Sequence, residues 1–243
     1  MPSVELELVL ADLVAQAQAA FADDLRSVVL FGSAAEDRLR PLSDVNLMFV
    51  LARFDPARAD AFREALRLAH TAVRASVMFL LQEELPVAAE LFAVKFNDMQ
   101  ARHRVLFGAD PLAGLVIDAA ELRRRLREVL LDLGIRLRER YVLVSLREEQ
   151  LVAVIADAAA PLRASALALL NLHGETAKSS RAALEQVAAA TGDAAFAAAV
   201  ASLPLAREAL HLAPGVAGPT LLALSRLAGY LRRGLEGEGS AKP

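Results

Sequence analysis

The sequence contains no cysteine, so the chain can form neither a disulfide bond nor a zinc site with thiolate ligands. Histidine is scarce as well, and its four copies are scattered with no pair at metal-ligand spacing: His70, His103, His173 and His211. These two observations exclude the common thiolate and imidazole metal centres from the candidate functions.

An excess of positive charge is also missing, because the net charge is −3, which gives no general electrostatic attraction for nucleic acid. One segment is rich in arginine, but acids lie among these arginines at a spacing of four: Glu121 with Arg125, Arg124 with Glu128, and Asp132 with Arg136. Such spacing predicts a solvated helix face that neutralises itself. We therefore expect no nucleic-acid partner.

The sequence has no uncharged apolar run long enough to cross a bilayer. Hydrophobic residues make up 56% of the chain, but many are alanine, which favours helix. Runs such as 151–156 end at an acid after a few residues. Near the N-terminus stand Glu5 and Glu7 in place of the basic region of a signal peptide. We expect a soluble cytoplasmic protein without a membrane partner.

Hydrophobic periodicity predicts a mixed α/β first half, with a small mixed sheet covered by helices. Four strands are expected, at 28–31, 44–51, 74–81 and 92–96. Helices are expected over 4–22, 56–70, 83–91 and 98–107. Gly108 and Pro111 then form an ordinary signal for the end of the last helix.

From Asp118 onward the pattern predicts helices alone, with stretches over 147–171, 175–190, 193–211 and 219–234 after a first long helix. Pro161 and Pro204 are expected to kink or break two of them. The predicted fold is therefore an α/β (α+β) domain over 1–117, followed by an all-α helical bundle over 118–235. The tail, 236–243, is predicted to be disordered.

Two neighbouring stretches carry the chemistry of the first domain. Gly32 and Ser33 follow a buried strand, and a glycine turn of this kind can hold phosphates. After a polar loop, Asp44 and Asn46 start the next strand on one face, where carboxylates can hold magnesium. A serine-capped turn and a turn residue at the start of a strand remain the simpler interpretations of Ser33 and Asp44.

The segments Leu30-Phe31-Gly32-Ser33 and Ser43-Asp44-Val45-Asn46-Leu47 resemble the signature of the polymerase-β-like nucleotidyltransferase superfamily. That signature is a Gly-Ser turn, a loop of roughly ten residues, and Asp-x-Asp on the next strand. The later segments 91–99 and 104–112 resemble those of bacterial two-domain members with a helical C-terminal half. The resemblance implies transfer of a nucleoside monophosphate from a triphosphate to an acceptor hydroxyl, with release of pyrophosphate. Two aspartates bind magnesium, and a third carboxylate completes the second metal site or takes the proton of the acceptor.

Carried over by residue, the resemblance implies phosphate binding at Gly32 and Ser33. Arg38 and Arg40 in the following loop can reach a triphosphate, and a solvated loop is the simpler interpretation of both. Asp44 takes the first metal position, and Asn46 stands where the second aspartate is expected. Alignment puts Lys95 at the third carboxylate position, where an ammonium group repels a metal ion. Two of the three metal-binding carboxylates are thus replaced.

Three hypotheses follow from this site. The first is a nucleotidyltransferase-fold protein whose weakened magnesium site leaves it a poor or inactive enzyme that acts by binding nucleotide or a partner. The second is an active, magnesium-dependent nucleotidyltransferase in which Asp44 and Asn46 ligate the metal. The third is a non-catalytic interaction module that binds a protein partner or a second copy of the chain. The substitutions at 46 and 95 favour the first.

Overall fold

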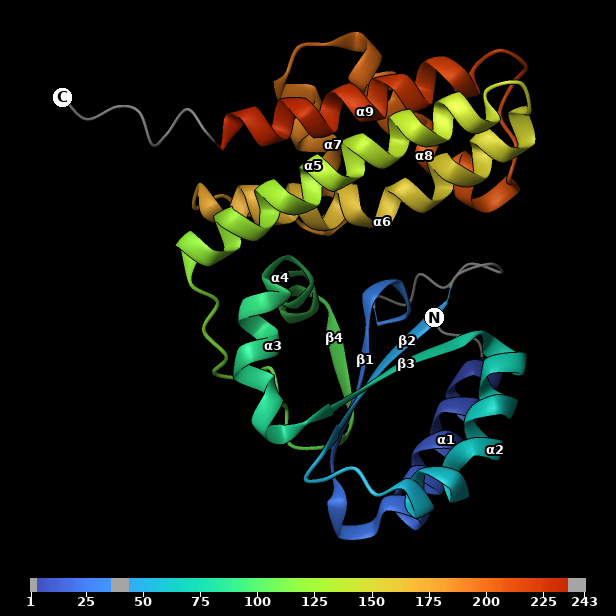
Figure 1. The fold of residues 1–243 in the computed structure, drawn as a ribbon, viewed down its shortest axis with the longest axis vertical. Coiled ribbons are helices and arrows are strands. Elements are labelled where there is room, and N and C mark those ends of the chain that lie inside the picture. Colours follow the sequence, from blue (N-terminus) through green and yellow to red (C-terminus); the bar gives the residue numbers. More distant parts are fainter. Residues whose placement is uncertain (1–3, 36–43, 236–243) are drawn as a thin grey trace, which may run out of the picture. The chain divides into compact units, whose positions relative to one another are not determined.

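The computed structural model describes residues 4–35 and 44–235, which fall into two compact units. The first unit combines Met1–Leu91 with Met99–Val116, and the second combines Phe92–Asp98 with Ile117–Pro243. Figure 1 shows strands and helices in the first unit and helices alone in the second. The predicted fold class, an α/β domain followed by a helical domain, is confirmed.

The first unit is built from α1 (Val4–Phe21), β1 (Leu25–Phe31), β2 (Val45–Leu51), α2 (Pro56–Val73), β3 (Ala75–Leu81), α3 (Leu85–Leu91) and β4 (His103–Gly108). Short 3-10 turns follow α1, β1 and β3, namely η1 (Ala22–Asp24), η2 (Gly32–Ala34) and η3 (Gln82–Glu84). Helix α4 (Ala93–Ala101) contributes residues to both units.

The four strands form one mixed sheet in the order β3-β2-β1-β4. β1 is antiparallel to β2 and β4, and β2 is parallel to β3. Helices α1 and α2 cover one face of the sheet, where Phe62 of α2 lies between Phe21 and Phe49 at ring distances of 5.4 and 5.5 Å. Figure 1 shows α3 on the opposite side of the sheet. The predicted small mixed sheet is therefore confirmed.

The alternation predicted for the second strand is also confirmed. Val45, Leu47 and Phe49 are fully buried in the core formed with α1 and α2. Successive side chains of a strand point to opposite faces, so Asn46 and Met48 lie on the other face. Met48 is buried there, whereas Asn46, at the start of the strand, is partly exposed.

The predictions for 92–107 are wrong, because the expected strand is helix α4 and much of the expected helix is strand β4. A short apolar run such as 92–96 suits a buried helix as well as a strand. Here Ala93 and Val94 pack into the core of the helical unit, which a helix allows. Gly108 does not end a helix. It closes β4 opposite Ser27, with a φ of 76°.

The second unit contains five long helices in its described part: α5 (Ala119–Val144), α6 (Glu148–Leu172), α7 (Ser180–Ala190), α8 (Ala194–Ala209) and α9 (Ala217–Gly234). α6 and α8 run on through Pro161 and Pro204 and do not break there. By length and composition alone α6 could span a membrane. However, 61% of its most apolar window is buried within the protein, as in the central helix of a bundle.

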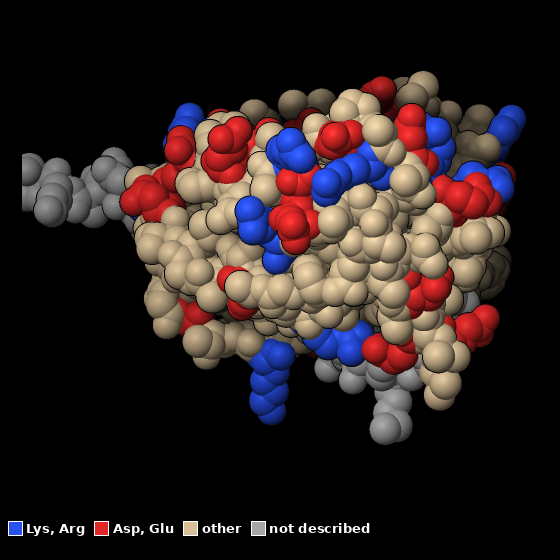
Figure 2. All heavy atoms as spheres, turned by 90° about the horizontal axis from the view of Figure 1, so that it is seen from below, with Lys and Arg blue, Asp and Glu red and all other residues tan. Residues whose placement is uncertain are grey.

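Three arginines of α5 pair with acids on their own helix, as the sequence predicts for this segment. Glu121 binds Arg124 at 2.6 Å and Arg125 at 2.8 Å, and Asp132 binds Arg136 at 2.9 Å. Arg124 thus pairs with Glu121 three residues before it rather than with Glu128. Basic and acidic side chains are also interspersed on the face of the molecule that Figure 2 shows.

Candidate functional site

A row of side chains crosses the sheet at the end of β1. Phe31 pairs with Asn46 of β2 on one side and with His103 of β4 on the other. Asn46 in turn pairs with Ser76 of β3. Paired residues of neighbouring strands share a face, so His103, Phe31, Asn46 and Ser76 lie in line. The polar members of this row are an imidazole, an amide and a hydroxyl.

The chain turns sharply beyond this row, at Gly32. Its φ is 79°, a left-handed conformation that glycine adopts without the steric cost of a Cβ atom. Its amide donates to the carbonyl of Arg102 at 3.2 Å, and its carbonyl accepts from Ala35 at 3.1 Å. A Cβ atom here would lie 3.7 Å from Nδ2 of Asn46. The structure therefore places the predicted turn and Asn46 side by side.

Asp44 stands just before β2 and binds Arg74, which stands just before β3. Arg74 Nε donates to Oδ1 of Asp44 at 2.9 Å, and more than half of each side chain is exposed. The backbone holds the same two segments together, because the amide of Val45 donates to the carbonyl of Arg74 at 3.3 Å. Asn46 Nδ2 reaches back to the carbonyl of Asp44 at 3.4 Å. A guanidinium group is therefore the direct neighbour of the expected first metal ligand.

Arg74 holds an unusual backbone conformation for its residue type. It caps the C-terminus of α2 with φ 54° and ψ 42°, and its amide donates to the carbonyls of Ala69 and His70. Glycine is the usual residue at such a left-handed cap, because a Cβ atom costs about 1–2 kcal/mol there. An arginine at this position therefore carries a local conformational cost.

Lys95, the residue aligned with the third carboxylate, does not lie on the expected strand. It lies on helix α4, among residues that pack with the helical unit, and not on a strand of the sheet. On the strand next to Asn46, the residue in register is Ser76. Ser76 and Arg74 are the site residues that sequence reasoning missed, since their position depends on the register of two parallel strands. Arg38 and Arg40 fall outside the described residues.

His103 is held between two acceptors at the start of β4. Its Nδ1 lies 3.0 Å from the carbonyl of Met99, and its Nε2 lies 3.1 Å from Oδ2 of Asp110. Partial burial would raise the pKa of Asp110, but hydrogen bonds from the Leu112 amide and from His103, together with the histidine charge, lower it below its ordinary value of 3.8.

The lowered pKa of Asp110 predicts a loss of stability in acid. Between the folded and unfolded pKa values the unfolded chain binds more protons, so the free energy of unfolding falls as the pH falls through the folded value. We expect the melting temperature to drop from about pH 5 to pH 3, with a shallower slope in Asp110→Asn. The exposed Asp60→Asn serves as control and should keep the wild-type slope. Equal slopes in all three proteins would contradict this role of Asp110.

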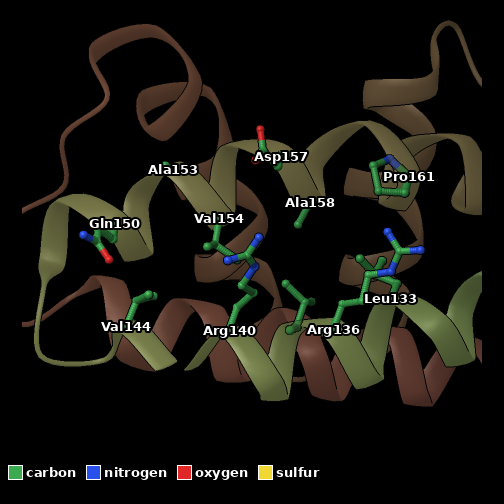
Figure 3. Close-up of a pocket in the computed structure, with 11 residues that line it drawn as sticks. Leu133, Arg136, Arg140, Val144, Gln150, Ala153, Val154, Asp157, Ala158 and Pro161 are labelled. Carbon is green, nitrogen blue, oxygen red and sulfur yellow. The ribbon is translucent and has the colours of Figure 1, made fainter. Parts of the chain in front are cut away.

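The helical unit holds a groove of about 480 Å³ between α5 and α6, which Figure 3 shows in close-up. Its lining is mainly apolar, and α5 adds Arg136 and Arg140. Pro161 has no backbone N–H, so the carbonyl of Asp157 in the groove wall lacks its usual helical donor. No motif in the sequence marks this groove.

No protein-family model matches the chain, and no curated protein sequence matches it. Solved structures do match. One is the spectinomycin adenyltransferase AAD(9) from Enterococcus faecialis, in a crystal structure with ATP and spectinomycin. The two chains share 12% sequence identity with a TM-score of 0.63, over 95% of this chain and 99% of that one. At this identity the likeness establishes the fold, which is that of a nucleotidyltransferase.

Proposed function

We propose that this protein binds a nucleoside triphosphate at the turn after β1 but transfers nucleotide poorly or not at all. The observation that carries the proposal is the contact between Asp44 and Arg74, beside the neutral pair of Asn46 and Ser76. Support for nucleotide binding comes from the fold, since the similar adenyltransferase was solved with ATP. Support for weak catalysis comes from the few charged oxygen ligands that these residues offer to a metal ion.

The side-chain oxygens at this site, among the described residues, are poor ligands for a pair of Mg²⁺ ions. Two dications beside a triphosphate require several carboxylate oxygens, because magnesium prefers hard, charged oxygen ligands in a near-octahedral arrangement. Among the residues at the starts of β2 and β3, 44–46 and 74–76, Asp44 is the one carboxylate, and a guanidinium group already binds it. Asn46 and Ser76 offer neutral oxygens, which leave most of the ionic charge uncompensated. A metal bound here would polarise the reacting phosphate and activate the acceptor hydroxyl.

The remaining features suit phosphate binding. Gly32 turns the backbone without a side chain, so a ligand can approach the chain closely at this point. Ser33, half-buried on the same turn, offers a hydroxyl that donates to phosphate oxygens. Arg74 supplies an exposed positive charge at the neighbouring strand. Binding without efficient transfer is the outcome that this combination supports best.

Calorimetry with each of the four nucleoside triphosphates, combined with an assay of pyrophosphate release, tests the proposal. We expect binding of at least one triphosphate and no release of pyrophosphate above that of Asp44→Asn. Absence of binding by all four would contradict the proposal and favour a pure interaction module.

An active, magnesium-dependent nucleotidyltransferase is the second candidate function. The observation in its favour is the likeness to an adenyltransferase along nearly the whole chain. In that case Asp44 and Asn46 would ligate magnesium through a carboxylate and an amide oxygen. Release of pyrophosphate that requires Mg²⁺ and is lost in Asp44→Asn would establish this candidate in place of the first.

A further inference from the structure

We infer that Arg74 replaces the divalent cation at this site, so that the protein binds the polyphosphate of a nucleotide without any metal ion. The inference rests on the proposed function, since it requires that a triphosphate binds at the turn after β1. Beyond the proposed function, it states how the protein neutralises the negative charge of that ligand. The ligand class is a polyphosphate chain, and the residue that recognises it is Arg74.

The position of Arg74 carries the first step of the argument. Its guanidinium lies 2.9 Å from the carboxylate of Asp44, where the resemblance assigns the first metal ion. Arg74 and Asp44 immediately precede two parallel neighbouring strands, and the hydrogen bond from Val45 to the Arg74 carbonyl joins these strand starts. The cation is therefore fixed beside the same carboxylate that a metal would bind.

Charge gives the second step. Three carboxylates carry −3 and repel a triphosphate until divalent ions bind between them. Here Asp44 and Arg74 sum to zero, and Asn46 and Ser76 add no charge. A triphosphate can therefore approach this strand end without the repulsion that makes metal ions necessary. The site is adapted to an anion by its own side chains.

The chemistry of the guanidinium group gives the third step. It carries five N–H donors in a planar fork that matches phosphate oxygens, and the one on Nε donates to Asp44. More than half of the side chain is exposed, so the ion pair is weak and can exchange its carboxylate for phosphate. The left-handed backbone at this position favours glycine, and strained residues of this kind gather at binding sites.

Titration of the protein with inorganic tripolyphosphate and with ATP, in EDTA and in Mg²⁺, tests the inference. We expect both ligands to bind in EDTA, with little gain on addition of Mg²⁺. Arg74→Gln should weaken binding in EDTA by about 10- to 100-fold, the range expected for the loss of hydrogen bonds to a charged group. Arg67→Gln, which removes another exposed and acid-paired arginine, from α2, is the matched control and should bind as the wild type does.

Asp44→Asn provides a test in which the two mechanisms predict opposite signs. If Arg74 is the phosphate-binding cation, loss of the Asp44 charge frees it, and affinity for tripolyphosphate in EDTA should rise by up to about fivefold. If a metal ion bridges Asp44 and the ligand, the same substitution should weaken binding in Mg²⁺. Melting curves of all variants verify that each protein is folded.

The possible failures are distinguishable. Binding that requires Mg²⁺, or that is unchanged in Arg74→Gln, overturns the role of Arg74 while the proposed nucleotide binding stands. Absence of binding of ATP and tripolyphosphate under both conditions, together with no binding of the other three nucleotides, overturns the inference and the proposed function together. Metal-independent binding that falls in Arg74→Gln and rises in Asp44→Asn supports both.

Discussion

Gly108→Ala is expected to destabilise the protein by about 3 kcal/mol or more, and to lower its melting temperature by roughly 10 °C. A Cβ atom at this position would lie 2.0 Å from the carbonyl oxygen of Arg26 and 3.1 Å from Cα of Ser27. Both neighbours are backbone atoms of β1, so no side-chain rotation can relieve the overlap. β4 would have to move away from β1, which breaks the edge of the sheet.

Gly114→Ala is the matched control, because Gly114 has nearly the same φ, 80°, but no atom within 4 Å of the added Cβ. The Gly114→Ala variant therefore loses only the stability that a left-handed alanine costs, about 1–2 kcal/mol, and the lower entropy of the unfolded chain offsets part of this loss. Thermal and urea unfolding of both variants therefore separate steric overlap from backbone strain. Equal losses of stability in the two variants would show that β1 and β4 do not approach as closely as described.

Asn46→Asp combined with Ser76→Glu should increase the affinity for Mg²⁺ by about tenfold or more, which corresponds to about 1.4 kcal/mol. The two residues are in register on parallel strands, so their new carboxylates would face one another beside Asp44. Three acids at one strand end bind a dication more tightly than one acid with two neutral oxygens. Mn²⁺ titration followed by electron paramagnetic resonance, with Mg²⁺ as competitor, measures the change.

Asn46→Asp with Ser76→Gln controls for the shape of the longer side chain without its charge. It should gain less affinity than the variant with glutamate. Equal affinities in the two double variants would mean that Ser76 does not face the position of the metal. Sequence reasoning alone would have placed the new glutamate at Lys95, which lies on α4 and not on a strand next to Asn46.

Local patterns in the sequence predict much of the first unit correctly, because each depends on neighbouring residues only. The alternation from Asp44 to Val50 marks the face that packs on α1 and α2, and Gly32 marks a turn. The interchange of helix and strand around Phe92 and His103 was not predictable in this way. A five-residue apolar run fits either structure, and the choice depends on packing partners far away in the chain.

The residues of the candidate site also divide into those that a local sequence pattern predicts and those that depend on distant parts of the chain. Gly32, Asp44 and Asn46 could be found because they lie on one short stretch with recognisable spacing. The contact between Asp44 and Arg74 joins residues 30 positions apart and depends on the parallel register of β2 and β3. Nothing within 74–76 alone signals that register.

Helix α4 has a consequence for any attempt to divide the protein. Ala93 and Val94 belong to the core of the helical unit, and Asn97 accepts a hydrogen bond from Asn171 at 2.9 Å, whereas the segment from Met99 onward belongs to the sheet unit. A fragment that begins at residue 118 would lose these partners and expose their apolar contacts to water. The helical unit, expressed alone from residue 118, would thus lack part of its own core, which a fragment that begins at Phe92 would keep.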